Sequence, residues 1–119
     1  MTDQEIYKEL GLIIYNESPN IENNLHILCR VVDVRVGTTI WWGNKKSGSF
    51  GLSPKSQARL VELIRKLKQF YIDNNFGEWN IFHYILDVNN SSFSIDFENS
   101  EEIANGEPFW KFSRKFFEG

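Results

Sequence analysis

The sequence has 119 residues, of which 41% are hydrophobic and 24% charged, and its formal net charge is −3. This length and composition are typical of one globular domain with an ordinary core, so we expect residues 1–119 to form a single domain. The single cysteine excludes an intrachain disulfide, and without an apolar run of ~18 residues or a basic, apolar leader we expect a cytoplasmic protein with no membrane span.

The first predicted element is a helix over residues 3–15. Thr2 and Glu5 have the spacing of a capping box, in which a hydroxyl and a carboxylate satisfy the first free amides of a helix. Apolar residues then recur at helical spacing, at positions 6, 10, 13 and 14. The stretch 16–24 contains a proline and several asparagines, which indicates a loop.

Three strands are predicted next. Residues 25–36 are rich in β-branched side chains and indicate one central strand. Residues 37–39 suggest a turn, and the second strand begins at residue 40. A further turn over 43–48 and a short third strand over 49–52 would complete a β-meander.

A long helix and a hairpin follow. Ser53 and Pro54 form a typical helix start, and one apolar stripe continues to about residue 74. Residues 79–88 and 93–98 alternate in polarity around an Asn/Ser turn, which predicts a β-hairpin. Residues 99–108 indicate an acidic loop. The tail over 109–117 is predicted as a helix that covers the sheet through Phe109, Trp110 and either Phe112 or Phe116.

The predicted fold class is therefore α+β. The element order α-β-β-β-α-β-β, followed by a tail helix, favours a largely antiparallel sheet of about five strands with helices packed on it.

This order and two aromatic segments resemble a known family. The segments are Trp79-Asn80-Ile81-Phe82, which leads into residues 92–98, and Trp110-Lys111-Phe112. With a first helix that carries Tyr7, they make the chain similar to the YezG-like immunity proteins, the antitoxins of bacterial polymorphic and contact-dependent toxin systems. The resemblance implies a small cytoplasmic protein that is not an enzyme and uses no cofactor. It also implies neutralisation of a cognate toxin domain, often a nuclease, by binding.

Acidic residues supply the candidate binding surface. Residues 69–110 contain no lysine or arginine, and their eight acids are Asp73, Glu78, Asp87, Asp96, Glu98, Glu101, Glu102 and Glu107. Nucleases hold phosphates with basic side chains, so an acidic surface is suited to such a partner. A solvated outer sheet face would show the same pattern. We expect the basic toxin domain, without direct nucleic-acid contact, to be bound by Asp87, Asp96, Glu98, Glu101, Glu102 and the aromatic anchor Trp42.

One alternative is a small nucleic-acid- or ligand-binding regulator that uses the turn with Trp41, Lys45 and Lys46. Rings for stacking and cations for phosphates would suit single-stranded nucleic acid. However, adjacent strand residues face opposite sides, and the net charge is negative rather than basic.

Catalytic and metal sites find little support in the pattern. His26 and Cys29 are three residues apart on one strand, so they should point to opposite faces and form no dyad. His83 and Asp87 share a face, which keeps an enzyme as a third hypothesis. Asp87 would bind a hard cation only if other hairpin acids converged on it, and no metal-site spacing is present. We therefore predict no catalytic residues and no metal.

Overall fold

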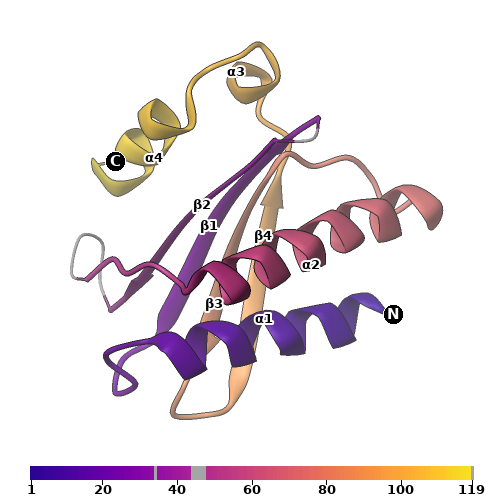
Figure 1. Cartoon of the computed structure of the whole chain (residues 1–119). Helices are drawn as coiled ribbons and strands as arrows, with labels where there is room; N and C mark the ends of the chain where they lie inside the picture. The colour runs from indigo at the N-terminus through magenta and orange to yellow at the C-terminus, as the bar shows by residue number, and fades with distance from the viewer. Residues whose placement is uncertain (34, 44–47, 119) are drawn as a thin grey trace.

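The computed structural model describes residues 1–33, 35–43 and 48–118. Within these residues the elements are α1 (Asp3–Glu17), β1 (Leu25–Val32), β2 (Arg35–Trp42), α2 (Pro54–Asp73), β3 (Ile81–Asp87), β4 (Ser92–Glu98), α3 (Glu101–Ala104) and α4 (Phe109–Glu118) (Figure 1). The strands form one antiparallel sheet in the order β2-β1-β3-β4. The α+β class is confirmed, with four strands in the described part instead of about five.

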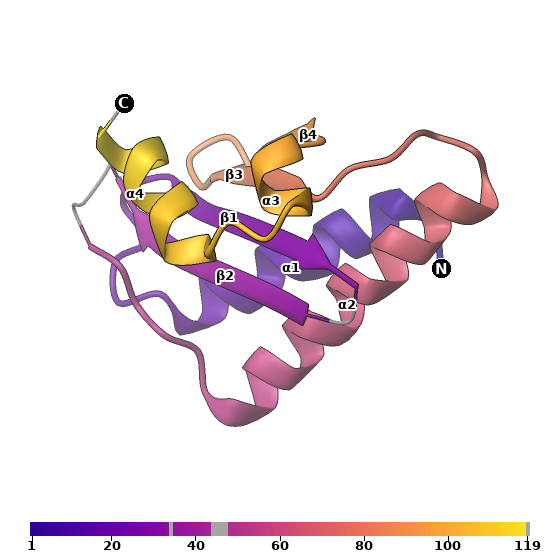
Figure 2. The same ribbon diagram turned by 90° about the horizontal axis from the view of Figure 1, so that it is seen from above.

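The sheet is the middle of three layers. The helices α1 and α2 cover one face, and α3 and α4 lie over the opposite face, as Figure 2 shows from above. The first face carries the larger core, which is built from the odd-numbered residues of β1 and the even-numbered residues of β3. The termini belong to helices on opposite faces of the sheet.

The strand boundaries of the first hairpin differ from the prediction. The chain reverses at Asp33, which has a φ of 54°, and β1 then pairs with β2 from Val32↔Arg35 to Leu25↔Trp42. Aspartate adopts this left-handed conformation more readily than β-branched residues do. The predicted strand over 25–36 and turn over 37–39 were therefore wrong, because residues 37–39 lie inside β2.

Gly37 is a packing position, which explains why a glycine occurs within a strand. A Cβ atom added there would lie 3.0 Å from the ring of Phe109 in α4. The predicted third strand over 49–52 is also wrong, since Ser49 makes only an isolated bridge to Trp41. Most of the predicted turn over 43–48 lies outside the described residues.

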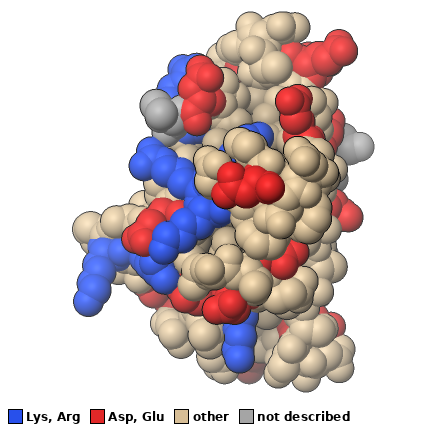
Figure 3. Space-filling model, turned by 90° about the vertical axis from the view of Figure 1, so that its right-hand side faces the viewer, with Lys and Arg blue, Asp and Glu red and all other residues tan. Residues whose placement is uncertain are grey.

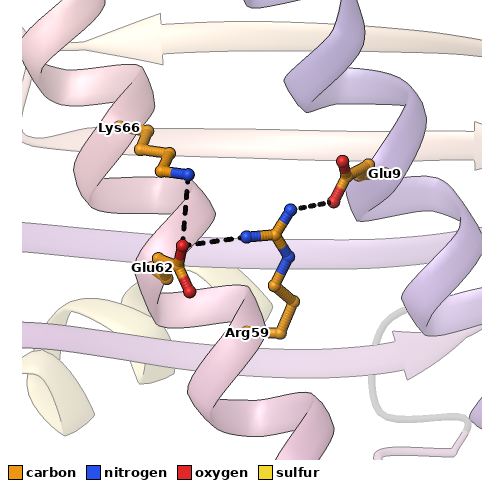
Figure 4. A network of polar contacts seen from close by, with 4 residues as sticks. All are labelled: Glu9, Arg59, Glu62 and Lys66. Atoms are coloured by element: carbon orange, nitrogen blue, oxygen red, sulfur yellow. Dashed lines mark hydrogen bonds and ion pairs between the residues drawn. The ribbon is translucent and has the colours of Figure 1, made fainter. Parts of the chain in front are cut away.

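The two long helices begin as their sequences predict. The Thr2 hydroxyl and the Glu5 carboxylate form the capping box of α1, and Ser53 caps α2 ahead of Pro54. A bridge of charged side chains joins the helices: Arg59 donates to Glu9 at 2.7 Å and to Glu62 at 2.9 Å, and Lys66 contacts Glu62 at 3.1 Å (Figure 4). These half-exposed pairs neutralise part of the basic face of α2 and contribute little stability each.

The second face has a smaller core under α4. Its buried residues are Leu28, Trp41, Ile81 and Ile103, and the side chains packed on them include Phe109, Phe112, Phe116 and Phe117. The predicted terminal helix is confirmed, but Trp110 does not cover the sheet because 66% of it is exposed. None of the described helices is both long and apolar enough to span a membrane.

The stretch predicted as an acidic loop contains the short helix α3. Buried Asn80 anchors its start: the Asn80 side-chain amide donates to the Ser100 carbonyl at 2.8 Å, and the Ser100 backbone amide donates to Asn80 Oδ1 at 2.7 Å. The Ser100 hydroxyl then caps the helix by accepting from the amide of Ile103. This anchoring places α3 directly after β4 at one end of the sheet.

Candidate functional site

Asp96 and Glu98 lie on the face of β4 that is turned toward α4. Their cross-strand partners are His83 and Ile81, which belong to the same face of β3. The predicted sharing of one strand face is thus confirmed. Both residues are exposed, and neither carboxylate forms a hydrogen bond or ion pair with any residue of the described part. Two free carboxylates on an edge strand form the centre of the candidate site.

Glu101 and Glu102 continue this acidic group. They occupy the first turn of α3, three and four residues after the end of β4, and both are exposed. Glu102 accepts hydrogen bonds from its own backbone amide and from the Ser100 hydroxyl. These bonds hold the pKa of the Glu102 carboxylate below its ordinary value. Four of the predicted acids therefore lie close together in the sequence, two at the end of β4 and two at the start of α3.

The structure does not bring Asp87 into this group. Asp87 ends β3 beside the hairpin turn, four residues from His83, the partner of Asp96, which corresponds to about 13 Å along the strand. Its carboxylate accepts from the side-chain amide of Asn90 at 2.8 Å and from the Asn90 backbone at 3.1 Å, which lowers the pKa of Asp87. The visible role of Asp87 is to fix the turn.

Trp42 also lies away from the acidic group. It pairs with Leu25 and therefore belongs to the opposite face of the sheet, on the strand at the opposite edge. It packs against the α1 and α2 core, with its ring 5.9 Å from that of Phe50. The predicted set of acids and Trp42 does not form one surface.

Figure 3 shows how the charges are distributed on one face of the molecule. Basic side chains form a band along one side of this view, whereas acidic side chains occur beside the band and in separate groups across neutral surface. Two further acids of the 69–110 segment have local contacts: Asp73 accepts from Gln69, and Glu107 is bound to Lys115 at 2.9 Å. The acid-only segment therefore does not produce one continuous acidic face.

A small groove of about 190 Å³ lies beside Asp96 and Glu98, between β4 and α4. Buried Leu28 and Ile81 contribute apolar lining, and the half-buried rings of Phe112 and Phe116 contribute aromatic lining. The two carboxylates complete the lining on the β4 side. Such a site combines apolar contact with negative charge.

Sequence reasoning did not predict the contact between two histidines, one of which, His83, also lines the groove. His26 of β1 and His83 of β3 lie on the same face, with His26 Nδ1 3.0 Å from His83 Nε2. The His26 ring stacks on Trp41 at 4.7 Å, and the Phe116 ring lies 5.2 Å from His83. Burial, followed by the proximity of His83, lowers the pKa of His26 from 6.5 to about 4. His26 is therefore neutral at pH 7.

The alternative sites lose support from the geometry. Trp41 is only 2% exposed, so its ring is not available for stacking with a nucleic-acid base, and Lys45 and Lys46 lie outside the described residues. Cys29 is buried on the face opposite His26, as its spacing predicted, and burial raises the pKa of its thiol. Among the residues with described positions, no three His, Cys, Asp or Glu side chains are grouped to hold a metal.

A larger hollow of about 580 Å³ lies on the other face, between α1 and the β3–β4 hairpin. Leu12, Tyr15 and Phe93 line it and are at least 36% exposed, while Lys8 is the cation at its border. This hollow is mainly apolar and is separated from the acidic group by the sheet.

No protein-family model matches this sequence, and a search among curated proteins finds no match. The similarity to YezG-like immunity proteins therefore stays a prediction made from the sequence.

Proposed function

We propose that this chain is a bacterial immunity protein that acts in the cytoplasm and neutralises a cognate toxin domain by binding it, without chemistry of its own. The observation that carries the proposal is the pair of free carboxylates, Asp96 and Glu98, which lies next to the aromatic side of α4. Exposed acids without internal partners add little to folding, but they attract and orient a cationic protein.

The proposed binding surface is narrower than the sequence suggested. It comprises Asp96 and Glu98 of β4, Glu101 and Glu102 of α3, and the neighbouring rings of α4. Asp87 and Trp42 are left out because each has a structural role elsewhere. A basic partner, such as a nuclease domain whose phosphate-binding residues are lysine and arginine, has the complementary charge.

The direct test is co-expression of this chain with the toxin encoded immediately upstream of it. We expect growth to be restored and a stable complex to be recovered on purification. Full toxicity with no complex would contradict the proposal. An inactive toxin variant should be used to measure affinity, so that binding and protection are scored separately.

The charge dependence of association gives a finer test. We expect the double variant Asp96→Lys with Glu98→Lys to associate at least about tenfold more slowly at low salt and to show a weaker salt dependence. The matched control is Glu22→Lys with Asp73→Lys, which changes the net charge equally on the loop before β1 and at the end of α2. Equal slowing by both variants would indicate a net-charge effect and place the interface elsewhere.

A further inference from the structure

The groove between β4 and α4 has the chemistry of a receptor for one cationic side chain. Its floor is apolar, through Leu28 and Ile81. The aromatic rings of Phe112 and Phe116 and the imidazole of His83 also line it. Its volume of about 190 Å³ is below the ~300–1,000 Å³ that is typical of small-molecule pockets. An occupant of this size with an apolar stem and a positive end matches the groove best.

We infer that this groove binds an arginine side chain of the protein partner, with its stem on the apolar floor and its guanidinium against Asp96 and Glu98. The inference rests on the proposed function and adds the residue type that the surface recognises. Arginine suits the site better than lysine because its planar guanidinium stacks on aromatic rings and bonds carboxylates through two parallel donors.

Two of the described cations of this face are engaged in other contacts. Arg30 lies over the ring of Phe109, with its guanidinium carbon 5.7 Å from the ring centroid, and Lys115 is bound to Glu107. Asp96 and Glu98 meanwhile stand two residues apart on one strand face, where like charges repel each other. A guanidinium supplied from outside would bond both carboxylates and relieve that repulsion.

An arginine of the toxin that is bound in this groove is no longer available to bind the toxin's substrate. In a nuclease, arginine forms bidentate contacts with phosphate oxygens, and these contacts resemble those it makes with carboxylates. The groove would thus take up a phosphate-binding residue of the toxin. The inference identifies the partner by chemistry: a protein that presents an accessible arginine within a basic surface.

The test uses the complete chain labelled with ¹⁵N and three small probes. N-acetyl-arginine amide should shift the backbone amide signals of β4 and α4 saturably, with a Kd of about 1–10 mM, as expected of a fragment of this size. N-acetyl-citrulline amide has the same shape without the charge and should bind at least tenfold more weakly. N-acetyl-lysine amide should bind at least threefold more weakly than the arginine probe.

Two variants separate the charge from the aromatic wall. Asp96→Asn with Glu98→Gln should weaken binding of the arginine probe at least fivefold, and Phe112→Leu should weaken it about threefold, whereas the control Glu22→Gln with Asp73→Asn should leave it unchanged. Shifts of equal size with citrulline, equal affinity for lysine, or full binding by the Asp96/Glu98 variant would overturn the inference.

The outcome for the groove can be distinguished from the outcome for the proposed function. A toxin complex whose affinity is unaffected by Asp96→Asn with Glu98→Gln, together with no selective arginine binding, would reject the groove and leave the immunity function standing. Selective arginine binding without any toxin complex would reject the immunity function and leave the groove as a receptor for a different basic protein.

Discussion

The two faces of the sheet differ in the size of the core that each one buries and in the charged groups that each one exposes. In the described part, the face under α1 and α2 buries sixteen core residues, whereas the face under α4 buries four in its cluster. Hydrophobic stabilisation increases with the apolar area removed from water, so the first face supplies most of the folding free energy. The second face combines a small core with free carboxylates and a histidine pair, and is therefore the better candidate for function.

The polar groups of the two faces show the same contrast. On the first face, the Tyr84 hydroxyl donates to the Tyr7 carbonyl at 2.8 Å, and the Tyr7 and Tyr71 hydroxyls are 3.2 Å apart. Burial raises the pKa of both Tyr7 and Tyr84, so these groups stay neutral. Substitutions in the first core should therefore change stability most, and substitutions of the exposed acids on the second face should change binding.

The largest expected effect is a cavity in the first core. Leu63 of α2 is fully buried, and Leu63→Ala should lower the free energy of unfolding by about 3 kcal/mol, within the usual range of roughly 2–5 kcal/mol. Urea denaturation measures this loss. The control on the same helix is Ile72→Ala, which removes a 57% exposed side chain and should change stability by less than about 0.5 kcal/mol. Similar losses in both variants would contradict the assigned packing.

A smaller effect is expected when the α4 packing is weakened. Phe109→Ala removes the ring that lies over Gly37 and beneath Arg30, and should cost about 1–2 kcal/mol. Because the first core is untouched, hydrogen exchange should accelerate in α4 much more than in α2. Uniform acceleration through both helices would mean that the two faces unfold as one unit.

Acid should destabilise the protein through His26. The pKa of His26 is lowered to about 4 in the folded state, while the unfolded chain keeps the ordinary value of 6.5. Between these values the unfolded state binds more protons, so stability is complete above pH 6.5 and falls as the pH approaches 4. After discounting for solvent screening of a half-buried ring, we expect a loss of about 1–2 kcal/mol.

Urea midpoints at pH 7 and pH 4.5 measure this dependence. The variant His26→Gln cannot take up the proton and should show a flatter profile over the same window. A wild-type profile parallel to that of His26→Gln would exclude His26 as the source of the acid sensitivity.

The smallest stability effect is expected at the proposed binding site. Asp96→Asn with Glu98→Gln should change the free energy of unfolding by less than about 0.5 kcal/mol, because both side chains are exposed and lack internal partners. The same variant should bind the toxin domain more weakly. A loss of stability above 1 kcal/mol, measured by urea denaturation, would show that these acids serve the fold.

Local chemistry was enough to predict the two long helices and the face of Asp96 and Glu98, although the short helix α3 was predicted as a loop. Capping residues such as Thr2 and Ser53 act within one turn, and strand alternation has a fixed period of two residues. The turn at Asp33 was missed because Gly37 gave the stronger local turn signal, whereas its role is to admit the ring of Phe109. That contact joins residues 72 positions apart, so no local pattern could reveal it.

The site could be predicted only in part for the same reason. Whether Trp42 lies near Asp96 depends on the strand order β2-β1-β3-β4, which places them on the two outer strands. The contact between His26 and His83 likewise requires β1 to pair with β3 across an intervening helix. Alternation assigns each residue to a face of its own strand, and only the long-range pairing determines which faces coincide.

The position of β4 at the border of the sheet has a consequence for how this protein behaves at high concentration. Its outer backbone amides and carbonyls are left without a neighbouring strand among the described elements, which is the arrangement that lets copies join edge to edge into fibrils. Charged side chains on such a strand keep identical molecules apart. We therefore expect Asp96 and Glu98 to oppose self-association through β4. Neutralising both side chains should make concentrated samples aggregate faster.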